Sequence, residues 1–147
     1  MHPPSEILLS IRRMVKLYDR YMEDTRRRHR LTQLEITIVS FLHNNPGYDT
    51  AKDISEMRML PKGNVSQGVE ALIQKSLLRR EPDARDRRRI HLALTEEAAP
   101  ILAEIEEARG RFLQRIFGNF TPEELSFYAE MSDRILKNMQ EDLEGAH

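Results

Sequence analysis

The stretch from Leu60 to Thr95 constrains the fold more than any other part of the chain. Its first half predicts a short helix over residues 62–75, because Val65, Val69 and Leu72 recur at the spacing of one helical face. Small polar residues occupy the start of this helix and would face away from that apolar stripe. The segment is therefore expected to pack on one side and to present a polar side to a partner.

The second half of the stretch predicts a basic β-hairpin. Leu78 opens one strand, and in the other Ile90, Leu92 and Leu94 alternate with Arg89, His91 and Ala93. Between them lies Pro82-Asp83-Ala84, which is typical turn chemistry. A helix followed by a basic hairpin is a winged helix, which can place the helix in a DNA major groove and the hairpin tip near the minor groove.

These residues resemble the MarR family of bacterial regulators, named for multiple antibiotic resistance. The resemblance covers nearly the whole chain, and its most specific parts are Asp86-Arg87-Arg88 and the Leu94-Thr95 that follows. The other matching positions are Asp53-Ile54, Val65-Ser66, Val69, Leu72, Leu77-Leu78, Arg80 and Pro82-Asp83. Met59 and Ser76 stand where the family usually has glycine, and Gly63 and Gly68 each weaken their helix by up to about 1 kcal/mol relative to alanine.

Composition limits the alternatives. The 147 residues suit one domain, and 39% apolar with 32% charged residues suit a helical soluble protein. The absence of cysteine excludes disulfides and thiolate zinc sites. The chain shows no signal-peptide pattern and no apolar run near the roughly 18 residues of a membrane span, so we expect a cytoplasmic protein without a membrane partner.

Charge is unevenly distributed along the chain. The net charge of −1 argues against a general nucleic-acid binder. Residues 52–91, however, hold ten Lys and Arg against six Asp and Glu, so this segment carries +4 and the remainder carries −5. A basic module on an acidic body can still bind phosphate locally.

Helix-start patterns place the other elements. Thr32 with Glu35, and Thr50 with Asp53, predict capping boxes that open two helices before the recognition helix. The first of these helices is apolar nearly all round and should be buried. A long helix should start at Thr95, with Pro100 in its second turn, and another at Thr121-Pro122-Glu123-Glu124.

The expected DNA contacts come from two places. Lys62, Asn64, Ser66 and Gln67 could reach base edges or phosphate from the first turns of helix 62–75, although Asn64 or Ser66 could instead only cap that helix. In the wing, the expected contacts are Arg85, Asp86, Arg87 and Arg88. The resemblance implies that Arg88 enters the minor groove and that Asp86 helps to hold it. The cluster Arg26–Arg30 at the end of the first helix could be a solvated helix end or a phosphate contact.

The termini predict a homodimer. The chain would form a single MarR-type domain over residues 1–147, with about 32–95 as the winged helix and about 5–30 and 96–145 as dimerisation helices. These terminal helices are amphipathic, and the small central module cannot fully cover them, so a second copy would. Family members dimerise through their first and last helices, and an intramolecular bundle is the alternative.

The resemblance also implies a small aromatic or phenolic effector between the dimerisation helices and the winged helix. Met14, Tyr18, Tyr21, Phe41 and His43 could line such a site, or could be ordinary core packing. The five histidines show no metal-ligand spacing, and we expect no metal, no cofactor and no catalytic residues.

The sequence thus predicts a mainly α protein with a β-hairpin wing that binds double-stranded DNA as a dimer. We expect a transcriptional repressor of a pseudo-palindromic promoter site, released by its effector and not an enzyme. The alternatives are a winged helix used for protein contact and a metal-responsive sensor.

Overall fold

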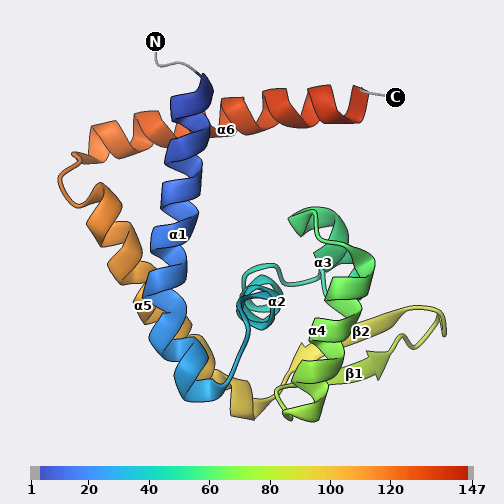
Figure 1. Ribbon diagram of the computed structural model, residues 1–147. Coiled ribbons are helices and arrows are strands. Elements are labelled where there is room, and N and C mark those ends of the chain that lie inside the picture. Colours follow the sequence, from blue (N-terminus) through green and yellow to red (C-terminus); the bar gives the residue numbers. More distant parts are fainter. Residues whose placement is uncertain (1–3, 146–147) are drawn as a thin grey trace. The chain divides into compact units, whose positions relative to one another are not determined.

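The computed structural model describes residues 4–145 and confirms the predicted architecture (Figure 1). The described residues form six α-helices, one 3-10 turn and a two-stranded antiparallel hairpin. In chain order these are α1 (Pro4–His29), α2 (Gln33–Asn44), α3 (Ala51–Arg58), α4 (Lys62–Gln74), β1 (Leu78–Pro82), β2 (Ile90–Leu94), η1 (Glu96–Ala98), α5 (Ala99–Phe117) and α6 (Pro122–Gly145). The chain divides after Phe112 into two compact units, and each is described by itself.

The predicted helix starts are formed by reciprocal hydrogen bonds. The Thr32 hydroxyl accepts from the Glu35 amide, and the Glu35 carboxylate accepts from the Thr32 amide. Thr50 and Asp53 form the same box at the start of α3, and so do Thr121 and Glu124 at the start of α6. These three boxes satisfy amide groups that helix termini otherwise leave without partners, so local sequence alone fixes where each helix begins.

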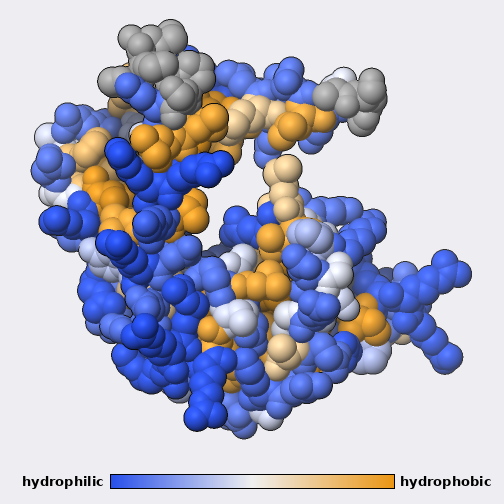
Figure 2. Space-filling model, in the orientation of Figure 1, coloured by the Kyte–Doolittle hydropathy of each residue, from blue (hydrophilic) through white to orange (hydrophobic). Residues whose placement is uncertain are grey.

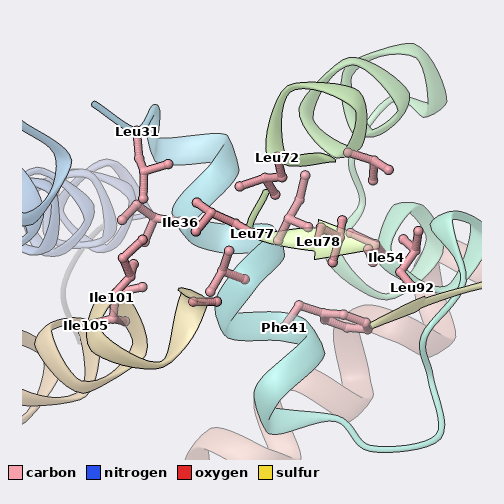
Figure 3. Close-up of a cluster of buried hydrophobic side chains, with 14 of the residues drawn as sticks. Leu31, Ile36, Phe41, Ile54, Leu72, Leu77, Leu78, Leu92, Ile101 and Ile105 are labelled. Atoms are coloured by element: carbon pink, nitrogen blue, oxygen red, sulfur yellow. The ribbon is translucent and has the colours of Figure 1, made fainter. Parts of the chain in front are cut away.

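Helix α2 forms the centre of the first unit, as its apolar sequence predicts. Ile36, Ile38, Val39 and Phe41 are at most 1% exposed. Figure 3 shows Ile36 and Phe41 on α2 within the cluster of buried side chains to which α1, α3, α4, the hairpin and α5 contribute. The winged helix therefore folds around one hydrophobic core.

A buried ion pair ties α2 to the end of α4. The Glu35 side chain is 3% exposed and lies 2.8 Å from Lys75 Nζ, which also donates to the Arg30 carbonyl oxygen. Burial alone raises the pKa of Glu35, but the hydrogen bonds from Lys75 and Thr32 outweigh it and hold the pKa below its usual value. The α1–α2 turn, α2 and the C-terminal end of α4 are thus joined by one charged contact.

Two predicted boundaries were displaced. The long helix does not start at Thr95; residues 96–98 form a 3-10 turn, and α5 begins at Ala99. Pro100 has no amide hydrogen to donate to Glu96, which explains why the regular helix can begin only beside it. Pro82, which we expected in the hairpin turn, is the last residue of β1 and pairs with Ile90.

The terminal helices leave apolar side chains exposed. On α1, Ile7, Leu8 and Ile11 are 51–60% exposed. In the second unit, α6 has no buried residue, and Figure 2 shows hydrophobic surface along it. Phe117 packs against Phe120 and Tyr128, with ring centroids 5.5 and 5.1 Å apart.

Candidate nucleic-acid interface

The first turns of α4 present polar side chains to the outside. Lys62, Asn64, Ser66 and Gln67 are all exposed, whereas Val65, Val69 and Leu72 of the same helix are buried. Pro61 occupies the N-cap position and makes no side-chain capping bond. Within residues 4–145, neither Asn64 nor Ser66 caps the helix, so all four side chains are available to an external partner.

The wing carries its arginines on a turn organised by two aspartates. Asp83 Oδ1 accepts hydrogen bonds from the Arg85 and Asp86 amides at 2.8 and 2.9 Å. Asp86 Oδ1 accepts from the Arg88 amide at 3.0 Å. The aspartate therefore orients Arg88 through the backbone in this structure, whereas the family pattern implied a role in holding the arginine.

Charge pairing separates the tip arginines from those on the strand. Arg79 pairs with Glu81, and Arg80 pairs with Glu70 on α4. Across the part of the chain that the structure describes, Arg85, Arg87, Arg88 and Arg89 have no acidic partner within ion-pair distance, and all four are exposed. Figure 2 shows the projecting hairpin tip as strongly hydrophilic, and the unpaired arginines of the hairpin lie at this tip.

A groove of about 690 Å³ lies between the wing and the start of α3. Lys52, Arg88 and Arg89 bring positive charge to it, and Asp53, Glu56 and Asp86 bring negative charge. Its charges are mixed, so the groove itself is a weaker phosphate site than the exposed tip.

His91 lies in a position that the strand pattern did not reveal. The alternation of β2 puts His91 on the face opposite Leu92, and that pattern predicts no partner for its ring. Its Nδ1 is 2.6 Å from Asp49 Oδ1 and its Nε2 is 2.7 Å from Asp83 Oδ2. The hydrogen bonds to Asp49 and then Asp83 raise the pKa of His91, and the bond with His91 is the main cause that lowers the pKa of Asp83. Asp49 is 42 residues away in sequence, so no local signal could have found this contact.

The basic cluster at the end of α1 is occupied by partners in the same chain. Arg26 donates to Gln33 at 2.7 Å, Arg27 pairs with Glu23, and Arg28 and His29 both contact Glu104 of α5. This favours the structural interpretation of the cluster over a role in phosphate contact.

Comparison with known proteins agrees with this geometry. Residues 30–89 match the family model described as MarR family, which covers α2, α3, α4, β1 and the wing tip. The greater part of the winged helix of this chain is therefore similar to the MarR family.

Solved MarR structures extend the likeness to the other helices. A MarR protein from Peptoclostridium difficile is 21% identical with a TM-score of 0.82, over 95% of this chain and 91% of that one. A MarR transcriptional regulator from Methanosarcina mazei is 14% identical with a TM-score of 0.78, over 92% and 98%. BpsR of Bordetella bronchiseptica, whose DNA binding is regulated by 6-hydroxynicotinic acid, is 19% identical with a TM-score of 0.69, over 88% and 98%. At these identities the structures show that the whole chain has the fold of the MarR transcriptional regulators.

Of the residues that we expected around an effector, Tyr18 and Tyr21 both pack on Phe112, with ring centroids 5.3 and 6.0 Å from it, but the five residues do not line one pocket. A polar pocket of about 410 Å³ is lined by Tyr18, Ser40, Asn44, Asn45, Arg58 and Arg109, so only Tyr18 of the expected set lines it. Phe41 is 1% exposed and lies under the Arg58 guanidinium, 5.4 Å from it. Met14 and His43 are exposed.

The pocket contains features that sequence reasoning missed. Arg58 and Arg109 bring two positive charges to it from α3 and α5. The buried hydroxyl of Ser40 has no hydrogen-bond partner among the described residues. Burial raises the pKa of Tyr18, so its hydroxyl remains a hydrogen-bond donor at neutral pH.

Residues 4–145 contain no group of three or more His, Asp or Glu side chains placed to hold a metal ion. None of the described helices combines the length and the apolar character needed to cross a membrane.

Proposed function

We propose that this protein is a homodimeric, sequence-specific DNA-binding regulator of the MarR type. Helix α4 would lie in the major groove and the wing in the flanking minor groove of a pseudo-palindromic site. The observation that carries the proposal is the pairing pattern of the charges: among the described residues the exposed arginines at the wing tip have no acidic partner, whereas the strand arginines Arg79 and Arg80 are paired with glutamates. A regulator of this kind acts in the compartment that holds the chromosome, so we place it in the cytoplasm.

A dimer would supply the second recognition helix and wing that a palindromic site needs. The exposed apolar residues of α1 and α6 support this, and so does an apolar groove of about 500 Å³ lined by Phe120, Phe127, Tyr128 and Met131 with two glutamates. In an isologous interface the same face of each copy is buried, so the exposed apolar residues of α1 and α6 would be covered in both subunits.

The effector would be a small aromatic or phenolic molecule that carries an anionic group. Arg58 and Arg109 suit a carboxylate or phenolate, and the Ser40 and Tyr18 hydroxyls can hydrogen-bond to it. One solved relative is regulated by such a compound, 6-hydroxynicotinic acid. Binding would change the spacing of the two recognition helices and release a repressed promoter, which is a coupling between two sites.

Matched arginine variants test the DNA-binding proposal. Operator fragments are first selected from a random duplex pool, and affinity is then measured against salt concentration. Replacing Arg87 and Arg88 by alanine should lower the slope of log affinity against log salt by up to about 2 per subunit, because each lost phosphate contact removes about 0.9. Replacing Arg79 and Arg80, which removes the same charge from the same hairpin, should change the slope little, because both are already paired with glutamates.

Base readout is tested in the same assay. Asn64→Ala should relax base preference at one or two positions, whereas Arg88→Ala should weaken binding to all sequences more evenly. Unchanged DNA affinity in the Arg87/Arg88 variant would contradict the proposal and would favour a winged helix used for protein contact. Adding 6-hydroxynicotinic acid to the wild-type complex, with Arg58→Gln as the control, tests the effector.

A further inference from the structure

A charged contact joins the wing to the loop that precedes α3. His91 of β2 bridges Asp49, in the loop between α2 and α3, and Asp83, at the start of the wing turn. The Leu92 amide donates to the Asp49 carbonyl oxygen at 2.8 Å, beside the imidazole. We call Asp49, His91 and Asp83 the wing clamp.

The geometry of the wing clamp sets the charge of the imidazole. Each ring nitrogen of His91 lies within 2.7 Å of a carboxylate oxygen. An ionised carboxylate only accepts hydrogen bonds, and a neutral imidazole has one N–H and one lone pair. Neutral His91 would therefore direct a lone pair at one aspartate, whereas the imidazolium donates to both.

The wing clamp also reaches the DNA-binding tip. Asp83 uses one oxygen to accept from His91 and the other to accept from the Arg85 and Asp86 amides. The Asp83 amide in turn donates to the Arg89 carbonyl oxygen at 3.0 Å. Moving Asp83 would thus move the turn that carries the free arginines.

We propose that His91, held as an imidazolium in the wing clamp, is a positioning residue that sets the wing against the helix-turn-helix and makes DNA binding depend on pH. The proposal rests on the proposed DNA-binding function. Loss of the proton leaves the imidazole with one N–H for two carboxylates, so one arm of the clamp opens and the wing turn is no longer fixed to the loop before α3.

The direction of the pH effect follows from the charges around the imidazole. Other charged groups also lie on the elements around the imidazole. On β1, Glu81 pairs with His91 across the hairpin. The groove beside the wing adds charges from α3 and from the wing itself: Lys52, Asp53, Glu56, Arg88 and Arg89. The two clamp carboxylates make direct contact and dominate, so the pKa of His91 lies above its ordinary 6.5. The clamp is complete below that raised pKa and is lost as pH rises through it.

The test is DNA affinity measured on the full-length protein between about pH 6 and pH 9. The wild type should lose affinity above the pKa of His91 by up to about tenfold per pH unit for each subunit, which is the limit for one linked proton, and so by up to about a hundredfold for a dimer with two wings. His91→Gln should bind more weakly at low pH and show no such slope. Asp49→Asn should keep the slope but move its onset to lower pH, because one of the carboxylates that stabilise the imidazolium is gone.

Two controls separate this role from a structural one. His29→Gln removes another partly buried histidine, which contacts Glu104, and should retain the wild-type slope. NMR of the imidazole nitrogens in the wild type without DNA should show both of them protonated at neutral pH. If His91→Gln does not fold, Asp49→Asn still tests the proposal, because the pH at which its DNA affinity begins to fall can be compared with that of the wild type.

The outcomes are distinct. Sequence-specific binding that is flat across the pH range, or an Asp49→Asn onset equal to that of the wild type, overturns the wing clamp alone. Failure to bind any selected duplex at any pH overturns the proposed function and this inference together.

Discussion

At the scale of single residues, three described residues other than glycine have the left-handed backbone conformation that normally favours glycine: Arg30 after α1 has φ +54°, and the other two are Met59 and Ser76. Met59, the C-cap of α3, has φ +52° and ψ +47°, and Ser76 after α4 has φ +63°. These are the two positions where the family pattern usually has glycine. A left-handed conformation costs roughly 1–2 kcal/mol for an L-residue with a Cβ. The turns after α3 and α4 therefore destabilise the folded state relative to turns with glycine.

We expect Met59→Gly to stabilise the protein. Relief of the left-handed strain should exceed the entropy that glycine adds to the unfolded chain, about 0.4–1 kcal/mol, and leave a net gain of roughly 0.5–1 kcal/mol. Little packing is lost, because Met59 is 76% exposed. Met57→Gly, on the same short helix but in regular helical conformation, should instead cost about 1 kcal/mol. Urea denaturation measures the free energy of unfolding of both variants. A loss of stability in Met59→Gly would contradict the expected relief of strain.

At the scale of elements, the close approach of α2 and α4 depends on one glycine. A Cβ added at Gly68 would lie 2.6 Å from Ile38 Cδ1 and 3.4 Å from two Leu34 atoms, whereas a Cβ at Gly63 would meet nothing within 4 Å. Ile38 is fully buried, so it has little room to yield. Gly68 thus seats the recognition helix on the core, although it weakens the helix itself.

Replacing each glycine by alanine should therefore have opposite effects. Gly63→Ala should stabilise by up to about 1 kcal/mol through helix propensity. Gly68→Ala has a similar intrinsic gain, but overpacking costs about 1–3 kcal/mol, so we expect a net loss of about 1 kcal/mol. Thermal unfolding measures the difference in stability between the two variants. Because the gain in helix propensity is nearly the same in both, this difference reports the cost of overpacking at Gly68. Equal stabilisation by both would show that Ile38 gives way freely.

Most elements could be predicted because their signals are local. The capping boxes at Thr32, Thr50 and Thr121 each need only residues three apart, and the apolar periodicity of α4 needs only one helix. The hairpin register also follows from alternation around a turn. The displaced start of α5 reflects Pro100, whose missing amide hydrogen the capping pattern at Thr95 does not take into account.

The parts that could not be predicted depend on side chains brought together by the fold. His91 looked like a surface residue of an alternating strand, and its partner Asp49 lies in a different loop. Arg58 and Arg109 meet Tyr18 in one pocket only after α1, α3 and α5 have packed. The effector residues suggested by resemblance were aromatic, whereas the pocket that forms is polar and basic.

At the scale of the whole molecule, the exposed apolar side chains of the terminal helices support the proposed dimer. Leucine and isoleucine side chains along α6 are between 37% and 60% exposed, and α6 has no buried residue. Fully burying one such side chain contributes about 1.5–3 kcal/mol. An entire helix that leaves this gain unused in the single chain is best explained by an isologous interface, in which every contact occurs twice.

We therefore expect Ile135→Lys to convert a dimer into monomers. Ile135 is 57% exposed in the single chain, and its loss from both copies should raise the dissociation constant by about two orders of magnitude or more, because two buried isoleucines are replaced by charges. Asn138→Lys adds the same side chain at another exposed position of α6 and should leave the dimer intact. Sedimentation equilibrium measures the dimer dissociation constant of each variant. The selected operator should bind only the dimeric variant tightly, because a monomer has one recognition helix. A wild type that is monomeric at micromolar concentration, or equal weakening by the two lysines, would mean that α6 is not the interface.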